Sequence, residues 1–587
     1  ARTIKDLFCR YKTLQGFQVN RKAGWDTHGL PVELSVEKEL GITKEDIGSK
    51  ISVEDYNKAC RNDVMKYKAK WEEITEKMGY WVDLKNPYVT YDNKYIESVW
   101  WLLAQMHKKG LLYKGHTIQP FSPKAGTGLS THELNQPGCY RNVKDTSAVV
   151  QFKLIQNDNA KFLFNKSKND IYFLAWTTTP WTLPSNTALA VGKKIQYLLI
   201  ETINQYTGNF ISIIIAKDLA GNYFNPKNSD LNLDNYQVGD KNLPFKIVAE
   251  FKGKDLQGLK YEQLLAYKKP ENGDAFKVLL ADFVTTEDGT GIVHIAPSFG
   301  SDDNNLAKEN GIGSLTLVNK QGKFVQEVTD FAGMYVKNEF YNEKEKPKLS
   351  ADIQIVIKLK KENLCFHSEK YEHSYPHCWR TDKPILYYPI DSWFVKTTKY
   401  KNKLIELNKR INWKPKSTGE GRFGKWLENL LDWNLSRSRF WGIPIPVWKT
   451  EDGVEELCIS SISQLKTEIE KSINAGIMTV NPLKKFKDKD FSIENYLSFD
   501  LHRPYVDDII LVSKRGFSMK REPDLIDVWF DSGAMPYAQL HYPFENKAEF
   551  ENTFPADFIA EGVDQTRGWF FTLHVIASLL FDSISYK

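Results

Sequence analysis

The stretch from Ala175 to Gly192, AWTTTPWTLPSNTALAVG, decides how the rest of the chain is interpreted. The apolar run IYFLAW leads into it and predicts a strand, so Thr177, Thr178 and Thr179 are expected where that strand ends. Pro180 and the proline four residues later disfavour further ladder pairing and place the hydroxyls in a loop. A row of hydroxyls beside indole rings can donate or accept hydrogen bonds and can orient a water molecule.

A second polar group lies farther along the chain, in the segment GTGIVHIAPSFGSDD. There a short strand is expected to end in a loop that carries His294, Asp302 and Asp303. Taken alone, the two segments also fit an ordinary β-branched strand end and a hydrogen-bonded histidine.

The composition is that of a globular protein with ample core material. The chain has 587 residues, of which 41% are hydrophobic and 26% charged, which suggests about three or four domains. We find no apolar run near the roughly 20 residues of a membrane span and no signal-peptide pattern. Six scattered cysteines are typical of a reducing compartment, so we expect a cytoplasmic protein. The net charge of +5 permits an RNA partner without arguing for one.

The two ends of the sequence suggest an internal piece of a longer protein. The chain starts without Met inside ARTIKDLFCRYKTL, whose apolar residues at positions 4, 7, 8, 11 and 14 predict an amphipathic helix. It ends with FFTLHVIASLLFDSISYK, in or just past another helix.

The segment GWDTHGLPVE carries the first group of polar side chains. Gly24, Gly29 and Pro31 interrupt regular structure around Asp26 and His28, so these side chains are expected on a loop. An ordinary turn capped by Asp26 would fit the same letters.

Two segments near the end of the chain predict a ligand site in an α/β sheet. The first segment is PDLIDVWFDSGAMP, in which residues 525–530 predict a buried parallel strand. The second is ADFIAEGVDQTRGWFFTL, in which residues 558–560 predict a strand and the residues from Thr566 onward predict a helix. Ligands of open α/β sheets bind beyond the carboxyl ends of the strands. The residues expected there are Trp529, Glu561, Gly562, Asp564 and Gln565.

Between about Lys144 and His367 the pattern changes. Short β-branched runs such as AVVQFKLI and NFISIIIA alternate with Gly, Asn and Asp clusters, which predicts a compact β-rich domain.

Taken in order, these motifs resemble class I aminoacyl-tRNA synthetases for branched aliphatic amino acids, and most closely their isoleucyl members. The resemblance rests on the threonine stretch, the HxAP pattern at His294, GWDTHGLPVE and DVWFDSG. It implies an α/β fold, a Rossmann-type parallel-sheet catalytic domain interrupted by a β-rich, β-barrel-like editing domain. The expected domains are 1–143 (first half of the catalytic domain with the start of the connective insert), 144–367 (editing) and 368–587 (second half with smaller insertions).

The resemblance also implies roles in a synthetic site for isoleucine, ATP with Mg²⁺, and tRNA(Ile). Asp26 would hold the α-ammonium group with help from Gln565, a charge-assisted contact suited to a buried cation. Trp529 and Trp569 would line the pocket for the aliphatic side chain. The adenosine contacts would be Glu561, Gly562 and Asp564.

In the insert the resemblance implies hydrolysis of mischarged valyl-tRNA. Asp303 would bind the substrate α-ammonium group, and the three threonines would position the terminal ribose and the attacking water. His294 and Trp181 would shape a pocket too small for isoleucine. The sequence suggests no Ser–His–Asp nucleophile, so direct attack by water is the simpler expectation.

The sequence departs from this family in several places. The HxGH signature, the KMSKS loop and the anticodon-reading domain are not found. Of the two CxxC zinc pairs, one keeps only Cys378, with Thr381 in place of its second thiol, and the other has Ser122 and Ala125 in place of both thiols. We therefore predict no structural zinc, because one thiol cannot close a tetrahedral site. Arg439, in WNLSRSRFWGIPIP, is a candidate contact for ATP or the acceptor end.

Other functions stay open at this point. They are a valyl or leucyl enzyme, a tRNA-binding or regulatory fragment without activation chemistry, and a freestanding editing hydrolase. We expect a monomer without membrane association.

Overall fold

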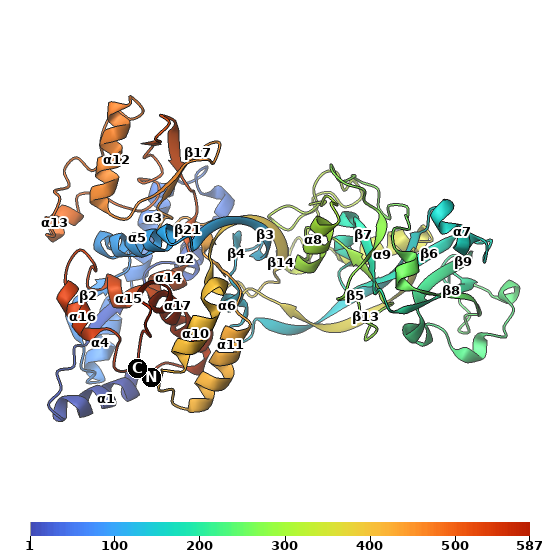
Figure 1. Ribbon diagram of the computed structural model, residues 1–587, viewed down its shortest axis with the longest axis horizontal. Helices are drawn as coiled ribbons and strands as arrows, with labels where there is room; N and C mark the ends of the chain where they lie inside the picture. The colour runs from blue at the N-terminus through green and yellow to red at the C-terminus, as the bar shows by residue number, and fades with distance from the viewer. Residues whose placement is uncertain (1) are drawn as a thin grey trace.

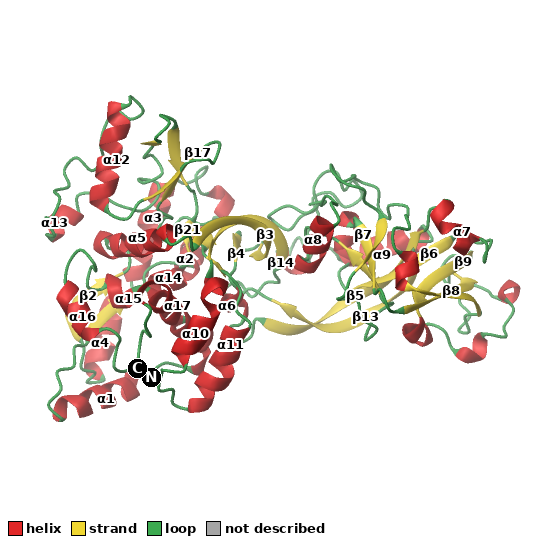
Figure 2. Ribbon diagram, viewed as in Figure 1, coloured by secondary structure: helices red, strands yellow, loops and turns green. Residues whose placement is uncertain are grey.

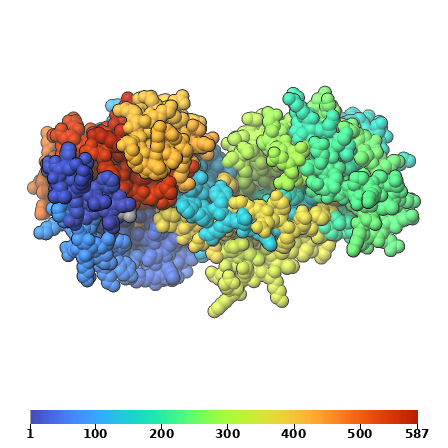
Figure 3. Space-filling model, turned by 90° about the horizontal axis from the view of Figure 1, so that it is seen from below, coloured from blue at the N-terminus to red at the C-terminus, as the bar shows by residue number. Residues whose placement is uncertain are grey.

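Two lobes joined by a long two-stranded ribbon make up the computed structural model, which describes residues 2–587 (Figure 1). Residues from both ends of the chain form the helix-rich lobe, here called the body, and residues from the middle form the β-rich lobe, here called the insert (Figure 2). The space-filling view shows the two lobes separated by a narrower waist (Figure 3). Within residues 2–587, no helix combines the length and the apolarity that crossing a membrane requires.

The helices of the body pack around an aromatic core. Trp100 of α5, Trp433 and Trp448 are fully buried in this core. Helix α17 has the sequence WFFTLHVIASLLF, and because this sequence is apolar all round, the helix is buried on nearly every side. The longer helices are α1 (Arg2–Leu14), α2 (Leu30–Leu40), α3 (Val53–Met65), α4 (Lys68–Lys77), α5 (Asn93–Lys108), α10 (Lys401–Asn408), α12 (Ile462–Asn474) and α17 (Trp569–Phe581). The amphipathic helix predicted at the start is confirmed as α1, with its apolar stripe exposed.

Several small sheets complete the body. Strands β1 (Lys22–Trp25) and β2 (Asp83–Val89) pair in parallel, whereas β3 (Leu112–Ser122) and β14 (Leu386–Val395) form a long antiparallel pair. The shorter strands are β4 (Thr127–Gly128), β15 (Trp433–Asn434), β16 (Ser436–Arg437), β17 (Val447–Thr450), β18 (Glu456–Cys458), β19 (Leu511–Val512), β20 (Ser518–Arg521) and β21 (Leu525–Ile526). The predicted α/β class, with a β-rich domain interrupting the body, is confirmed.

The insert is built on one curled, mixed sheet of nine strands. Strand β6 is buried over almost its whole length because apolar cores cover both of its faces, which explains the unbroken run IYFLAW. The strands are β5 (Tyr140–Lys153), β6 (Ile171–Thr177), β7 (Ala188–Val191), β8 (Gln196–Ile203), β9 (Phe210–Ala216), β10 (Phe245–Lys252), β11 (Lys277–Leu280), β12 (Ile292–Ile295) and β13 (Cys365–Pro376). Helices α8 (Ser301–Glu309) and α9 (Ala351–Lys361) pack beside them.

Strands β5 and β13 form the ribbon between the lobes (Figure 2). They pair antiparallel, with Val143 opposite His373. Asp145 on the ribbon accepts hydrogen bonds from Lys337 Nζ at 2.7 Å and faces His373 Nε2 at 3.1 Å. The proposed domain limits at 143/144 and 367/368 both lie within this ribbon.

Four predicted elements differ in the structure. The strand expected at 525–530 ends at Ile526, because Asp527 caps a helix, α14 (Val528–Gly533), by accepting the Trp529 N–H at 3.3 Å. Residues 558–560 form no strand, and the last helix starts at Trp569. His294 lies inside β12 and not in a loop, and the first turn of α8 carries Asp303.

Arg439 is a buried structural residue, which corrects its assignment as a ligand contact. Its Nε donates to Glu33 at 3.0 Å, its Nη2 pairs with Glu37, and its Nη1 donates to the Ala125 carbonyl at 2.9 Å. Arg437 similarly pairs with Glu133 at 2.5 Å. These pairs connect the N-terminal and C-terminal parts of the body.

We predict that Arg439→Ala lowers the free energy of unfolding by about 3–5 kcal/mol, because it leaves Glu33 and Glu37 buried without their partner. The matched control is Arg515→Ala, which removes an exposed arginine that pairs with Asp452 and should cost less than about 1 kcal/mol. Chemical denaturation of both variants measures the difference. Equal losses in the two variants would contradict the structural role of Arg439.

Candidate functional site

The threonine segment of the insert forms a connected row of hydroxyl groups. Thr177 ends β6, and the short helix η3 (Pro180–Ser185) follows. The Thr179 N–H donates to Thr177 Oγ1 at 3.1 Å, and the hydroxyls of Thr179 and Thr182 lie 3.4 Å apart. Thr178 and Thr179 are partly exposed, whereas Thr177 is buried.

His294 faces this row from β12. Its Nε2 lies 2.8 Å from Thr182 Oγ1, and its Nδ1 lies 3.3 Å from the Asn186 amide nitrogen. Asn186 Oδ1 accepts the Tyr261 hydroxyl at 2.7 Å, so the amide nitrogen is the group that donates to His294 Nδ1. The proton of the ring therefore sits on Nε2 and points at Thr182.

The environment keeps His294 uncharged. Burial lowers its pKa to about 4, so the ring is neutral at physiological pH. Both ring nitrogens already have partners, which leaves His294 able to shape the site but without a free nitrogen to abstract a proton. Thr182, Asn186 and Tyr261 were missed in the sequence, although the first two belong to the quoted threonine segment.

Asp303 folds back onto the end of β12. Its Oδ2 accepts the Ala296 N–H at 2.8 Å, two residues beyond His294. Burial raises the pKa of Asp303 to about 6, and the negative charge of Asp302 adds to this rise. Within residues 2–587, no hydrogen bond joins Asp303 to the threonines; the two groups follow the carboxyl ends of β12 and β6, which pair in parallel.

Trp181 is anchored in the core beside this row. Its indole packs edge-on against Phe299, with ring centroids 5.0 Å apart, and the backbone N–H of Trp181 donates to Asp352 Oδ1 at 2.9 Å. The buried indole nitrogen has no hydrogen-bond partner among the described residues. Trp181 therefore forms a fixed apolar wall.

A second group of predicted residues meets in the body. Asp26 follows β1 and accepts the Ser532 hydroxyl at 2.8 Å, and the Ser532 carbonyl accepts the Trp569 indole N–H at 2.8 Å. Gln565 Oε1 accepts the Trp569 backbone N–H at 3.1 Å. The structure thus brings together side chains from the start and the end of the chain.

The Trp529 ring joins this group of residues by packing against Gly568. A Cβ at Gly568 would lie 2.8 Å from the Trp529 ring and 3.0 Å from Gln565 Oε1, so only glycine allows the close approach. The Trp529 ring also stacks on Trp379, with centroids 6.0 Å apart.

Asp26 is accessible to solvent but surrounded by dense protein. Burial of the carboxyl group in this surrounding is the main cause that raises the pKa of Asp26 to about 7; a negative charge on Asp531 would contribute to the rise, and the Ser532 hydrogen bond opposes it. A cation bound at Asp26 would favour its charged form, so the site is suited to an ammonium group.

The residues assigned to adenosine lie next to Gln565. Asp564 accepts the Gln565 amide at 2.9 Å, and Glu561 forms an ion pair with Lys5 of α1. The Asp564 carboxylate lies close to Gly562, at 2.3 Å from where a Cβ on Gly562 would be, so a side chain there would require Asp564 to move. Glu561 would have to exchange Lys5 for a ribose hydroxyl to make its assigned contact.

Cys378 is confirmed as a small buried residue, packed with Leu129, Leu134 and Ile385. Within residues 2–587, no group of three or more His, Cys, Asp or Glu side chains is placed to hold a metal ion. The absence of structural zinc stays a prediction.

Comparison with known proteins places the chain among the tRNA synthetases. The family model of class I tRNA synthetases (I, L, M and V) matches residues 1–587. The chain is 62% identical to the isoleucine–tRNA ligase of Cytophaga hutchinsonii, covering 100% of the chain and 52% of that protein. It is 60% identical to that of Bacteroides thetaiotaomicron (100% and 54%) and 46% identical to that of Clostridium tetani (100% and 50%). The chain therefore spans about half the length of the curated relatives it matches.

We predict that Asp303 makes the stability of the chain depend on pH. Because its pKa is 3.8 in ordinary surroundings and about 6 when folded, the folded state binds more protons between these values, and stability falls as pH rises through this range. The expected loss is about 2 kcal/mol, allowing for the partly exposed carboxylate.

The measurement compares denaturant unfolding of the wild type and Asp303→Asn near pH 4 and near pH 8. The variant should gain about 2 kcal/mol relative to the wild type at the higher pH. A stability difference that does not change with pH would contradict this prediction.

Proposed function

Because the chain belongs to the class I tRNA synthetases of the isoleucine, leucine, methionine and valine group, we propose that the protein containing it ligates isoleucine to tRNA(Ile). We also propose that its insert hydrolyses mischarged valyl-tRNA(Ile). The observation that supports the proposal is that hydrogen bonds connect the Asp26 carboxylate with Ser532, and Ser532 with Trp569.

The proposed activation is in-line attack of the isoleucine carboxylate on the α-phosphate of ATP, which enters as its magnesium complex. The bond to pyrophosphate breaks, and isoleucyl-adenylate forms. Asp26 would bind the α-ammonium group through a charge-assisted hydrogen bond. Trp529 and Trp569 would enclose the aliphatic side chain, and Glu561, Gly562 and Asp564 would contact adenosine.

Discrimination between isoleucine and valine requires a second step. A pocket gains only about 1–3 kcal/mol from one methylene and cannot exclude the smaller valine. This argument was already established for synthetases of this kind and does not come from the present structure. A second site that accepts valine and excludes isoleucine removes the errors.

The geometry of the insert supports hydrolysis by a bound water. Thr178 and Thr179 are partly exposed, and their hydroxyls would position the terminal ribose and the water. Asp303, at the end of β12, would supply a carboxyl group for the α-ammonium group. His294 is neutral and hydrogen-bonded at both nitrogens, so it fits the assigned role of shaping the pocket with Trp181.

A fragment limited to editing or tRNA binding is less favoured, because Asp26, Trp529 and Gln565 would have no use in it. A cytoplasmic location and a monomeric state stay predictions from the sequence.

We predict that the full-length protein catalyses isoleucine-dependent ATP–pyrophosphate exchange. Valine should be about 10- to 200-fold poorer in kcat/KM, and leucine should not exceed valine. Asp26→Asn should lower kcat/KM for isoleucine about 10- to 100-fold, since it removes a hydrogen bond to a charged group. Asp452→Asn, on an exposed turn, is the matched control and should leave the exchange unchanged. Preference for another amino acid would overturn the proposed substrate.

A separate prediction concerns the insert. With valyl-tRNA(Ile) as substrate, Asp303→Ala in the full-length protein should slow hydrolysis about tenfold or more, because the ammonium group loses its charged partner. Asp302→Ala, at the neighbouring exposed position of α8, is the control. Equal hydrolysis rates in the two variants would remove Asp303 from the proposed site.

A further inference from the structure

A continuous chain of hydrogen bonds runs through the body behind Asp26. Asp531, the residue before Ser532, lies with Oδ2 at 2.8 Å from His28 Nδ1. His28 Nε2 lies 2.9 Å from His502 Nε2, and His502 Nδ1 lies 2.5 Å from Asp500 Oδ1. The side chains of Asp531, His28 and His502 are almost completely buried.

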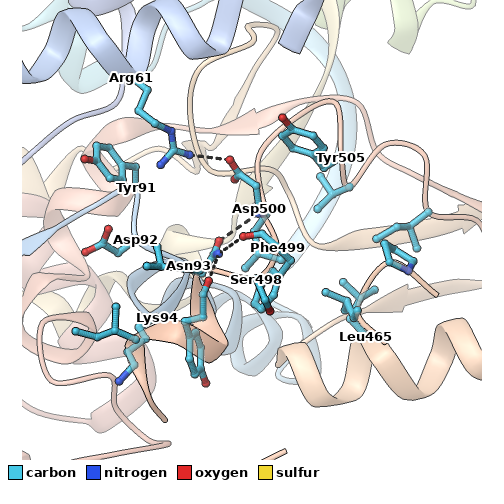
Figure 4. Close-up of a pocket in the computed structure, with 18 residues that line it drawn as sticks. Arg61, Tyr91, Asp92, Asn93, Lys94, Leu465, Ser498, Phe499, Asp500 and Tyr505 are labelled. Carbon is cyan, nitrogen blue, oxygen red and sulfur yellow. Dashed lines mark hydrogen bonds and ion pairs between the residues drawn. The ribbon is translucent and has the colours of Figure 1, made fainter. Parts of the chain in front are cut away.

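The outer end of this chain is anchored by a charge. Arg61 donates to Asp500 Oδ2 at 2.8 Å, and the two side chains face each other at the edge of a cavity of about 640 Å³ (Figure 4). Against the opposing effect of burial, the contact with His502 and then the Arg61 charge hold the pKa of Asp500 well below its usual range. Asp500 is therefore an anion that can only accept a proton from His502 Nδ1.

The proton positions follow from this anchor. If His502 carries its proton on Nδ1, its Nε2 is an acceptor, so the proton between the two rings belongs to His28 Nε2. His28 Nδ1 is then an acceptor as well. The remaining group at its 2.8 Å contact, Asp531 Oδ2, must supply the proton.

The alternative places a positive charge on one of the rings and a negative charge on Asp531. Burial lowers the pKa of His28 to about 3 and of His502 to about 4, and Arg61 adds a repelling positive charge near both. Trp441, stacked on His502 with ring centroids 4.8 Å apart, excludes water from that side. Both rings are therefore held neutral.

An ionised Asp531 would also lack a partner of its own. Its second oxygen, Oδ1, is buried and makes no hydrogen bond within the described residues, and burial raises its pKa well above the usual value. The charged groups that share its small cavity are already paired: Arg437 with Glu133 and Asp527, and Arg439 with Glu33 and Glu37. The other titratable groups facing it are Asp26 and Tyr95, whose hydroxyl donates to the Asp531 carbonyl.

We propose that Asp531 is an un-ionised carboxylic acid at neutral pH, held so by the chain through His28, His502 and Asp500. This inference rests on the proposed function for its consequence. Asp26 then carries the negative charge that binds the α-ammonium group, with no second charge beside it to repel the substrate carboxylate. Asp531 and His502 are positioning residues that act through Asp26 and His28.

The direct test is infrared difference spectroscopy of the full-length protein at pH 7. The spectrum of the wild type minus Asp531→Asn should contain the carbonyl band of an un-ionised carboxyl group. The matched control, Asp452→Asn, removes an exposed aspartate whose pKa is lowered to about 2, and should lose only carboxylate bands. An Asp531 difference spectrum with carboxylate bands alone would overturn the inference.

A second readout is the pH dependence of kcat/KM for isoleucine in pyrophosphate exchange. An ionised Asp531 raises the pKa of Asp26, so removing it would move the acid limb of the profile to lower pH. We expect the limb to stay in place in Asp531→Asn, within about 0.3 pH units, and a shift of about one unit or more would overturn the inference.

If Asp531→Asn does not fold, the wild-type acid band is followed to about pH 9 instead. At that pH the other carboxyl groups with raised pKa values have ionised, among them Asp26, Asp352 and Asp527 at about 7, and Asp303 at about 6. Persistence of a band supports the inference, and its complete loss overturns it. A failure of the proposed function would be recognised in a different measurement. In that case Asp26→Asn would leave isoleucine-dependent pyrophosphate exchange unchanged, whatever the infrared spectrum shows for Asp531.

Discussion

Buried arginine–carboxylate pairs hold together the two parts of the body that the insert separates in sequence. Arg439 reaches Glu33, 406 positions earlier, and Arg437 reaches Glu133, 304 positions earlier. Each guanidinium pairs with two carboxylates, and all of these side chains are buried, so neither partner can be removed without leaving a buried charge. The placement of Asp26 against Ser532 depends on this connection, because the same two parts of the chain supply them.

The carboxyl groups assigned to substrate binding differ from these structural carboxylates in their partners. Asp26 and Asp303 have no arginine partner at hydrogen-bond distance among the described residues, and their pKa values are raised to about 7 and about 6. Such groups are destabilised as anions until a cation arrives. Under the proposed function, the α-ammonium group of the substrate supplies that cation in both lobes, so one recognition chemistry serves synthesis and editing.

The insert separates the two sites by building its own core. Its nine-stranded sheet carries apolar clusters on both faces, and the ribbon of β5 and β13 is its paired connection to the body (Figure 1). The polar row of Thr177, Thr179 and Thr182 meets His294 where β6 and β12 lie side by side in this sheet. Under the proposed function, the mischarged end of the tRNA would travel between lobes along this connection.

The sequence by itself determined the α/β class, the β-rich interruption, the family and the segments that carry chemistry, because these depend on local patterns and ordered motifs. Tertiary structure decided which side chains meet. The Asp527 cap converts an expected strand into α14, and Arg439 proves structural once its carboxylate partners are seen. Tyr261, Asn186 and His502 escaped notice because their contacts join residues 75 to 474 positions apart. No local periodicity encodes such contacts, since they arise only when burial forces distant polar groups to satisfy one another.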